Sequence, residues 1–265
     1  MAAGNDLVNL GLFEMGLAYG FVMLSVGLSR LQGAGQEKAL LLSSLRMVGQ
    51  LLAMGYALRL IFALQNPAGV MLILLMMLAM SVQTIAGRVR HRLPGFYRVV
   101  GVSMVLGCGA LTLLFCSLVV GISPWFDPRY LIPLSGMIIG NAMTGASLAA
   151  ERFSEEIRSR RDEIETALCL GATAAEAAKP ARRSAFRAAL IPSINAMAAM
   201  GIVFLPGMMT GQILSGTEPL VAVKYQMAIM AVITGSVSLT ATLILWQGQR
   251  GYFTRAHQLR VSLLD

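Results

Sequence analysis

The sequence predicts an all-α, polytopic integral membrane protein. Hydrophobic residues make up 56% of the 265 positions, and charged residues only 13%. Soluble domains carry about 25% charged residues, so this chain has far more apolar surface than one soluble core would bury. The apolar runs reach the roughly 20 residues that a spanning helix needs, and they lack the alternation of membrane strands. A bilayer is therefore the expected solvent.

Seven apolar stretches are long enough to cross the hydrocarbon core. We expect spans at 7–29, 42–64, 70–87, 99–121, 130–150, 190–214 and 226–247. The first stretch does not read as a cleavable signal, because it lacks a basic start and Glu14 interrupts its apolar run. The chain is expected to form one transmembrane domain over residues 1–265, with a cytoplasmic segment at 151–189.

Basic residues are concentrated on one side of these spans. Eighteen of the 21 Lys and Arg residues lie in segments 30–46, 88–98, 152–187 and 250–260. Positively charged loops face the cytoplasm, so we expect an outward N-terminus, an inward C-terminus and a multi-pass location in the inner (plasma) membrane. The net charge of +8 is then explained by topology and by attraction to anionic lipids, and no nucleic-acid partner is expected.

The segment 151–189 has the sequence pattern of a loop that docks onto another protein. Charge pairs four residues apart, such as Glu156 with Arg160, favour an amphipathic helix at 151–170, which also reads as an extension of the fifth span. Gly171 ends that helix, and Thr173 with Glu176 forms a capping-box pattern that starts a short helix at 174–179. Pro180 then suits the first turn of the next helix. Such a short alanine-rich helix suits docking onto another protein, and the alternative is a solvated turn.

A family resemblance begins in this loop. The stretch from Glu165 to Gly171 resembles the Glu-Ala-Ala-xxx-Gly loop of ABC transporter permeases, which forms the coupling helix. Further motifs at 46–52, 136–145, 170–173, 191–197, 205–214 and 224–226 together resemble the FetB family of iron-export permeases, which includes plant aluminium-tolerance proteins. The resemblance covers roughly residues 9–259.

That resemblance implies a permease that dimerises and pairs with a separate ATP-binding subunit to export iron or another metal ion. It places the coupling site at Glu165, Gly171, Ala172, Thr173, Ala174 and Glu176. A phosphate-binding P-loop needs a lysine after a glycine, and none of the three lysines follows one. The chain is therefore not expected to be an enzyme or to hold a cofactor, and ATP hydrolysis would occur on the partner subunit.

Polar and flexible positions inside the spans are candidates for a translocation path or hinge. They are Glu14, Gln50, Asn141, Thr144, Pro206, Met208, Met209, Thr210 and Gln212. Asn141 and Thr144 share a helix face, and Pro206 is expected to kink the sixth span. We also expect an ion pair between Glu14 and Arg59, whose depths in the first two spans are similar. No set of residues identifies a metal site.

Small residues spaced four apart allow close helix approach, either within one chain or at a dimer seam. The pairs are Gly16 with Gly20, Gly136 with Gly140, and Gly207 with Gly211. The main alternative function is a secondary transporter driven by an ion gradient. The third class is an intramembrane enzyme or a membrane scaffold, and the predicted spans contain no Ser/His dyad, paired aspartates or HExxH motif for proteolysis. The sequence leaves open whether residues 215–224 re-enter the membrane.

Overall fold

A computed structural model describes residues 11–64, 66–89, 95–254 and 256–260. Helices dominate the described residues, and the only β-type pairings among them are two isolated bridges. The all-α prediction is confirmed. By contacts the chain divides into two compact units, one of residues 1–66 and 214–216 and the other of residues 67–213 and 217–265.

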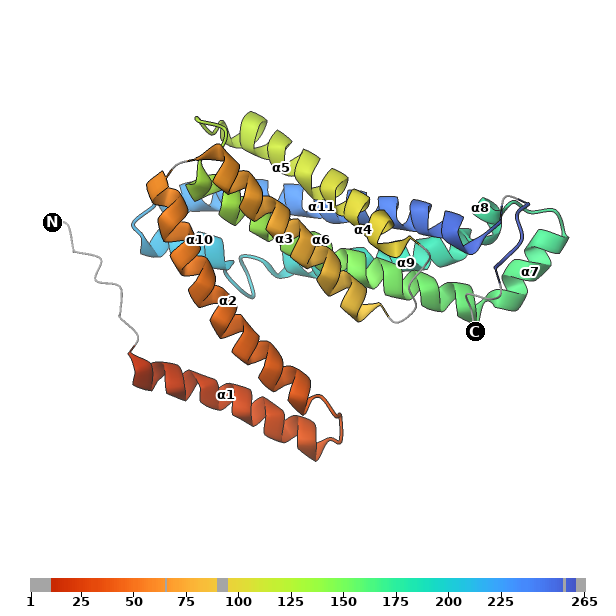
Figure 1. Cartoon of the computed structure of the whole chain (residues 1–265), viewed down its shortest axis with the longest axis horizontal. Coiled ribbons are helices and arrows are strands. Elements are labelled where there is room, and N and C mark those ends of the chain that lie inside the picture. Colours follow the sequence, from red (N-terminus) through yellow and green to blue (C-terminus); the bar gives the residue numbers. More distant parts are fainter. Residues whose placement is uncertain (1–10, 65, 90–94, 255, 261–265) are drawn as a thin grey trace. The chain divides into compact units, whose positions relative to one another are not determined.

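The first unit is a helical hairpin. Helix α1 (Leu12–Leu31) packs against α2 (Glu37–Leu64), as Figure 1 shows in red and orange. The turn between them uses Gly33 at φ 61° and Gly35 at φ 65°, a left-handed conformation that glycine adopts without a side-chain penalty. Most of the apolar side chains described in these two helices are exposed, as expected of helices that face lipid.

The second unit is a bundle of long helices with short ones at its ends (Figure 1). Its elements are α3 (Pro67–Arg88), α4 (Phe96–Met104), η1 (Val105–Ala110), α5 (Leu111–Leu114), η2 (Phe115–Val120), α6 (Pro128–Ser159), α7 (Arg161–Cys169), α8 (Ala174–Ala177), α9 (Lys179–Ala199), α10 (Gly207–Leu214) and α11 (Pro219–Tyr252). Segments α4 to η2 form one continuous helix with two π-helical turns.

Six helices among the described residues are long and apolar enough to cross a membrane: α1, α2, α3, the helix Phe96–Val120, α6 and α11. A seventh continuous span at 190–214 is contradicted. Helix α9 ends at Ala199, residues 200–206 are not α-helical, and α10 begins at Gly207. Gly201 turns the chain at φ 84°, and Pro206 disfavours helix at the residue before it. Pro206 therefore precedes a new helix and does not kink a continuous one.

Helix α6 is the centre of the second unit, where it packs against α3, α9 and α11. Among the glycines of α6, Gly145 allows the closest approach, because a Cβ there would lie 2.6 Å from Val237 Cγ1 and 3.3 Å from the Ala189 carbonyl oxygen. Across the bundle, the Ser236 hydroxyl of α11 donates a hydrogen bond of 3.0 Å to the Gly107 carbonyl. Close packing and a buried polar bond thus fix α11 against its neighbours.

We predict that Gly145→Ala destabilises the bundle by about 1–3 kcal/mol, because the added methyl group overpacks the contact with α9 and α11. Gly101→Ala on α4 is the matched control, since a Cβ there meets nothing within 4 Å. Thermal melting in detergent should show a lower midpoint for Gly145→Ala alone. Equal midpoints for the two variants would contradict this packing.

Candidate coupling site

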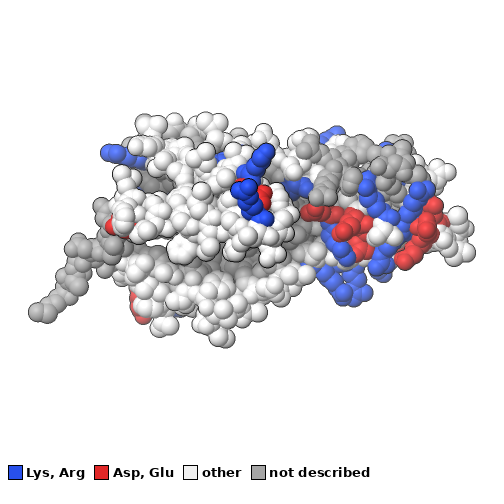
Figure 2. Space-filling model, turned by 90° about the horizontal axis from the view of Figure 1, so that it is seen from below, with Lys and Arg blue, Asp and Glu red and all other residues white. Residues whose placement is uncertain are grey.

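The end of the second unit formed by α7, α8 and the start of α9 carries many of its charged side chains. Figure 2 shows blue and red side chains gathered at this end, at the right of the view. At 1.5 Å per residue the 32 residues of α6 extend about 48 Å. Because the hydrocarbon core is about 30 Å thick, α6 is long enough to carry this end beyond it.

Backbone hydrogen bonds in the turn after α7 cap the C-terminus of that helix. Helix α6 is interrupted at Arg160, so the expected helix at 151–170 is the end of α6 followed by α7. After α7, the Gly171 amide donates to the Leu168 carbonyl and the Ala172 amide donates to the Ala167 carbonyl. This pattern is a Schellman motif, and Gly171 supplies its left-handed residue at φ 91°.

Helix α8 begins with the predicted capping box. The Thr173 hydroxyl accepts a hydrogen bond from the Glu176 amide at 3.3 Å, and the Glu176 carboxylate accepts one from the Thr173 amide at 2.9 Å. The Thr173 hydroxyl also donates to the Glu176 carboxylate at 2.7 Å. The bonds that this carboxylate accepts from the Thr173 amide and hydroxyl hold the pKa of the Glu176 carboxyl below its ordinary 4.5. The carboxylate's contribution to the cap is therefore complete above pH 4.5 and is lost as the pH falls through the lowered pKa.

The base of α8 rests on a core made largely of alanine. Ala174 and Ala178 are buried together with alanines of α9 and with Ile164 of α7. The same core includes Phe153 of α6 and Tyr252 of α11, whose hydroxyl hydrogen-bonds Ser154 at 2.7 Å. Small side chains let these helices lie close together, so α8 packs on α7 and α9 and shares one buried core with α6 and α11.

The described residues after α11, 253–254 and 256–260, form a strap that contacts α8. An isolated β-bridge joins Phe253 to Leu259, and the Thr254 amide donates to the Gln258 carbonyl. At the end of this loop, His257 Nδ1 accepts a hydrogen bond of 3.2 Å from the Ala174 amide. The sequence analysis missed His257, because no local pattern predicts a contact between residues 83 positions apart.

The six predicted coupling residues lie on α7, on α8 and in the turn between them, with different surroundings. Gly171, Thr173 and Glu176 are exposed, and Leu170 beside them is 83% exposed. Glu165 forms an ion pair of 3.0 Å with Arg161. Ala172 is half-buried, and Ala174 faces the core at 7% exposure. Leu170 and Ala175 are thus the accessible neighbours that the prediction left out.

The candidate path residues fall into separate groups. Asn141 and Thr144 lie on one stripe of α6 and hydrogen-bond its own carbonyls. Pro206, Met208, Met209, Thr210 and Gln212 lie at the break and on α10, where the Thr210 amide and hydroxyl donate to the Pro206 carbonyl. Glu14 and Gln50 are exposed residues of the first unit.

The expected pair of Glu14 with Arg59 is not present among the ion pairs of the described residues. Glu14 instead sits in the first turn of α1, with its carboxylate close to Gly11. The described residues also contain no cluster of three or more His, Cys, Asp or Glu side chains.

Comparison with known proteins places this architecture in a family. The model of the uncharacterised protein family UPF0014 matches residues 12–253. The chain belongs to this family. UPF0014 relatives include a membrane protein of Synechocystis, 39% identical over 96% of this chain and 98% of its own length. Another is the Arabidopsis thaliana protein ALUMINUM SENSITIVE 3, 33% identical over 96% of this chain and 92% of its own length.

A third relative is the probable iron export permease protein FetB of Escherichia coli, 30% identical over 95% of both chains. These UPF0014 relatives bear out the resemblance found in the sequence. The chain is a multi-pass membrane permease of this family. No solved structure matches the chain.

Removal of the α8 cap should loosen this site locally. Thr173→Ala is expected to cost about 1 kcal/mol, because the Glu176 amide loses its side-chain acceptor. Amide hydrogen exchange across 174–177 should then rise about fivefold. Thr166→Ala is the control, since that hydroxyl bonds only its own helix at Asp162. Unchanged exchange in Thr173→Ala would show that the cap does not hold α8.

Proposed function

We propose that this chain is the membrane subunit of an ABC exporter, driven by a separate ATP-binding subunit that docks on α8. The observation that carries the proposal is the exposed tip of Leu170–Glu176, held by a Schellman motif and a capping box on a core shared with α6, α9 and α11. A tip anchored in this way moves with the long helices. Motion of the docked subunit on ATP binding is thereby passed to the transmembrane bundle.

The basic end faces the cytoplasm in this proposal, with the N-terminus outside and the C-terminus inside the inner (plasma) membrane. The whole chain acts as one permease domain, and the α9–α10 segment completes a seventh, interrupted crossing. The cargo is iron or another metal ion. Membership of UPF0014 and the iron-export name of the Escherichia coli relative support this cargo.

Two copies form a homodimer around the path. On α6, a Cβ at Gly140 would meet nothing within 4 Å, and Asn141 beside it is exposed. Small residues on an open helix face, here Gly140, allow a second helix to approach closely, whereas a Cβ at Gly136 would lie 3.1 Å from Met77 Cε of α3. Asn141 and Thr144 lie on this face and supply polar groups along the seam.

The break between α9 and α10 also belongs to the path. Its backbone leaves the helix, and Ile202 and Val203 are 90% and 78% exposed. Unsatisfied backbone groups cost several kcal/mol each in hydrocarbon, so irregular backbone at membrane depth faces protein or a water-filled cavity. We place the break at the seam, with Pro206 as its hinge and Met208, Met209, Thr210 and Gln212 following along the path.

The interrupted helix favours one alternative. Secondary transporters build their ion and substrate sites from such discontinuous helices. Metal flux in proteoliposomes separates the two functions, because an exporter of the ABC class needs the ATP-binding subunit and ATP. A gradient-driven transporter would carry the metal with an ion gradient alone.

Leu170→Glu should abolish stimulation of the ATP-binding subunit by this chain, because it places a charge on the exposed apolar tip. Ser159→Glu, an exposed position at the end of α6, is the control and should retain stimulation. Ala174→Glu is the poorer probe, since Ala174 is buried and its replacement disturbs the core. ATPase activity in proteoliposomes measures all three. Full stimulation by Leu170→Glu would argue against docking at this tip.

A further inference from the structure

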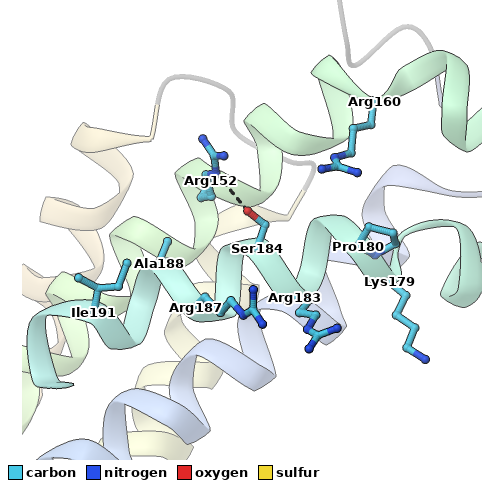
Figure 3. A pocket seen from close by; sticks show the side chains of 9 residues that line it. All are labelled: Arg152, Arg160, Lys179, Pro180, Arg183, Ser184, Arg187, Ala188 and Ile191. Carbon is cyan, nitrogen blue, oxygen red and sulfur yellow. Dashed lines mark hydrogen bonds between the residues drawn. The ribbon is translucent and has the colours of Figure 1, made fainter.

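A basic groove of about 760 Å³ lies between the C-terminal end of α6 and the first half of α9. Five cationic side chains line it: Arg152, Arg160, Lys179, Arg183 and Arg187. Figure 3 shows the first two extending from the end of α6 and the other three from α9. The groove is separate from the path residues, and a concentration of positive charge disfavours a metal cation as its ligand.

One wall of the groove is fixed by a buried carboxylate. Glu156 is 5% exposed, and its carboxylate forms ion pairs of 2.7 Å with both Arg152 and Arg160. The same carboxylate accepts a hydrogen bond of 2.8 Å from the Ser184 hydroxyl of α9. A second bond joins Arg152 Nε to the same hydroxyl at 3.3 Å (Figure 3). These contacts hold two guanidinium groups in place and join α6 to α9.

The other wall carries positive charge without a carboxylate. Arg183 and Arg187 are exposed, one turn apart on α9, and take part in none of the ion pairs found among the described residues. Guanidinium groups bind phosphate oxygens through paired N–H donors. This half of the groove is therefore complementary to a phosphate group.

The lining of the groove changes from charged to apolar along α9. After Arg187 its lining becomes apolar, first with Ala188 and, one turn after Arg187, with Ile191, which is 53% exposed. The apolar end continues toward the transmembrane part of the bundle, and the charged end lies beside α8. A ligand that matches both ends carries an anionic phosphate and a hydrocarbon tail. Basic pockets between transmembrane helices on the cytoplasmic side bind lipid headgroups of this kind.

We propose that this groove binds the headgroup of an anionic phospholipid, with the phosphate on Arg183 and Arg187 and the acyl chain beside Ile191. A lipid held there contacts α9 within two turns of α8. Its binding stabilises the α6–α9 arrangement on which the α7–α8 tip rests. The proposal does not depend on the identity of the cargo or on the ATP-binding subunit.

The test compares lipid retention by the full chain and by Arg183→Gln/Arg187→Gln. Native mass spectrometry from detergent containing phosphatidylglycerol and phosphatidylcholine should show wild type retaining phosphatidylglycerol selectively. The variant should bind it about 30-fold more weakly, since each surface cation contributes about fivefold. Arg129→Gln/Lys224→Gln removes two exposed cations from the opposite ends of α6 and α11 and should behave as wild type. Melting curves for both double variants verify that they are folded.

Two competition experiments distinguish the phosphate of a lipid from a free phosphate. Inorganic phosphate and glycerol phosphate should compete only weakly, because they lack the acyl chain that meets Ile191. Equal retention of phosphatidylglycerol by wild type and the Arg183/Arg187 variant would overturn the proposal. So would competition by free phosphate at the affinity of the lipid. Loss of ATP-binding-subunit association with unchanged lipid retention would likewise overturn it, by making the groove a protein-docking surface.

Discussion

The contact of α6 with α9 and α11 is the constraint on which the rest of the second unit depends. Gly145 brings the three helices together inside the bundle, and alanines of α8 and α9 continue the contact toward α7. Because α6 and α11 are longer than the hydrocarbon core is thick, the same packing extends past the membrane. The short helix α8 depends on this core as well as on its capping box, since four residues do not form a stable helix alone.

This arrangement explains how a small surface element can act on a large bundle. A loop without contacts to the bundle would move with a docked partner and would not pass that motion to the long helices. The α7–α8 tip instead has its base in the core of the long helices, and the His257 strap ties it to the end of α11. In the proposed exporter, the ATP-binding subunit therefore acts on α6, α9 and α11 together. The proposed lipid contact acts on the same α6–α9 pair.

Local features of the sequence predicted much of this site. The glycine stop at Gly171, the capping box of Thr173 with Glu176 and the helix start at Pro180 depend on neighbouring residues, so their patterns are readable. Hydropathy likewise predicted six of the spans. Features that depend on distant residues were not readable: Ala174 faces inward because of the core around it, and His257 reaches α8 through the strap.

The missed helix break and the absent ion pair have similar causes. Hydropathy averages over the apolar stretch at 190–214 and does not register the turn at Gly201 or the effect of Pro206 on Leu205. The pairing of Glu14 with Arg59 assumed that similar depth in two helices means contact. Helix rotation also decides contact, and the sequence of one chain does not specify it.

The most direct test of the proposed coupling uses a thiol that the protein already has. Cys169 is exposed at the end of α7, whereas Cys108 and Cys116 are buried. A membrane-impermeant maleimide should label Cys169 in inside-out vesicles, and labelling should slow several-fold once the ATP-binding subunit is bound. Vesicles containing this chain alone are the control. Labelling from the outer face only, or equal rates with and without the subunit, would contradict the account.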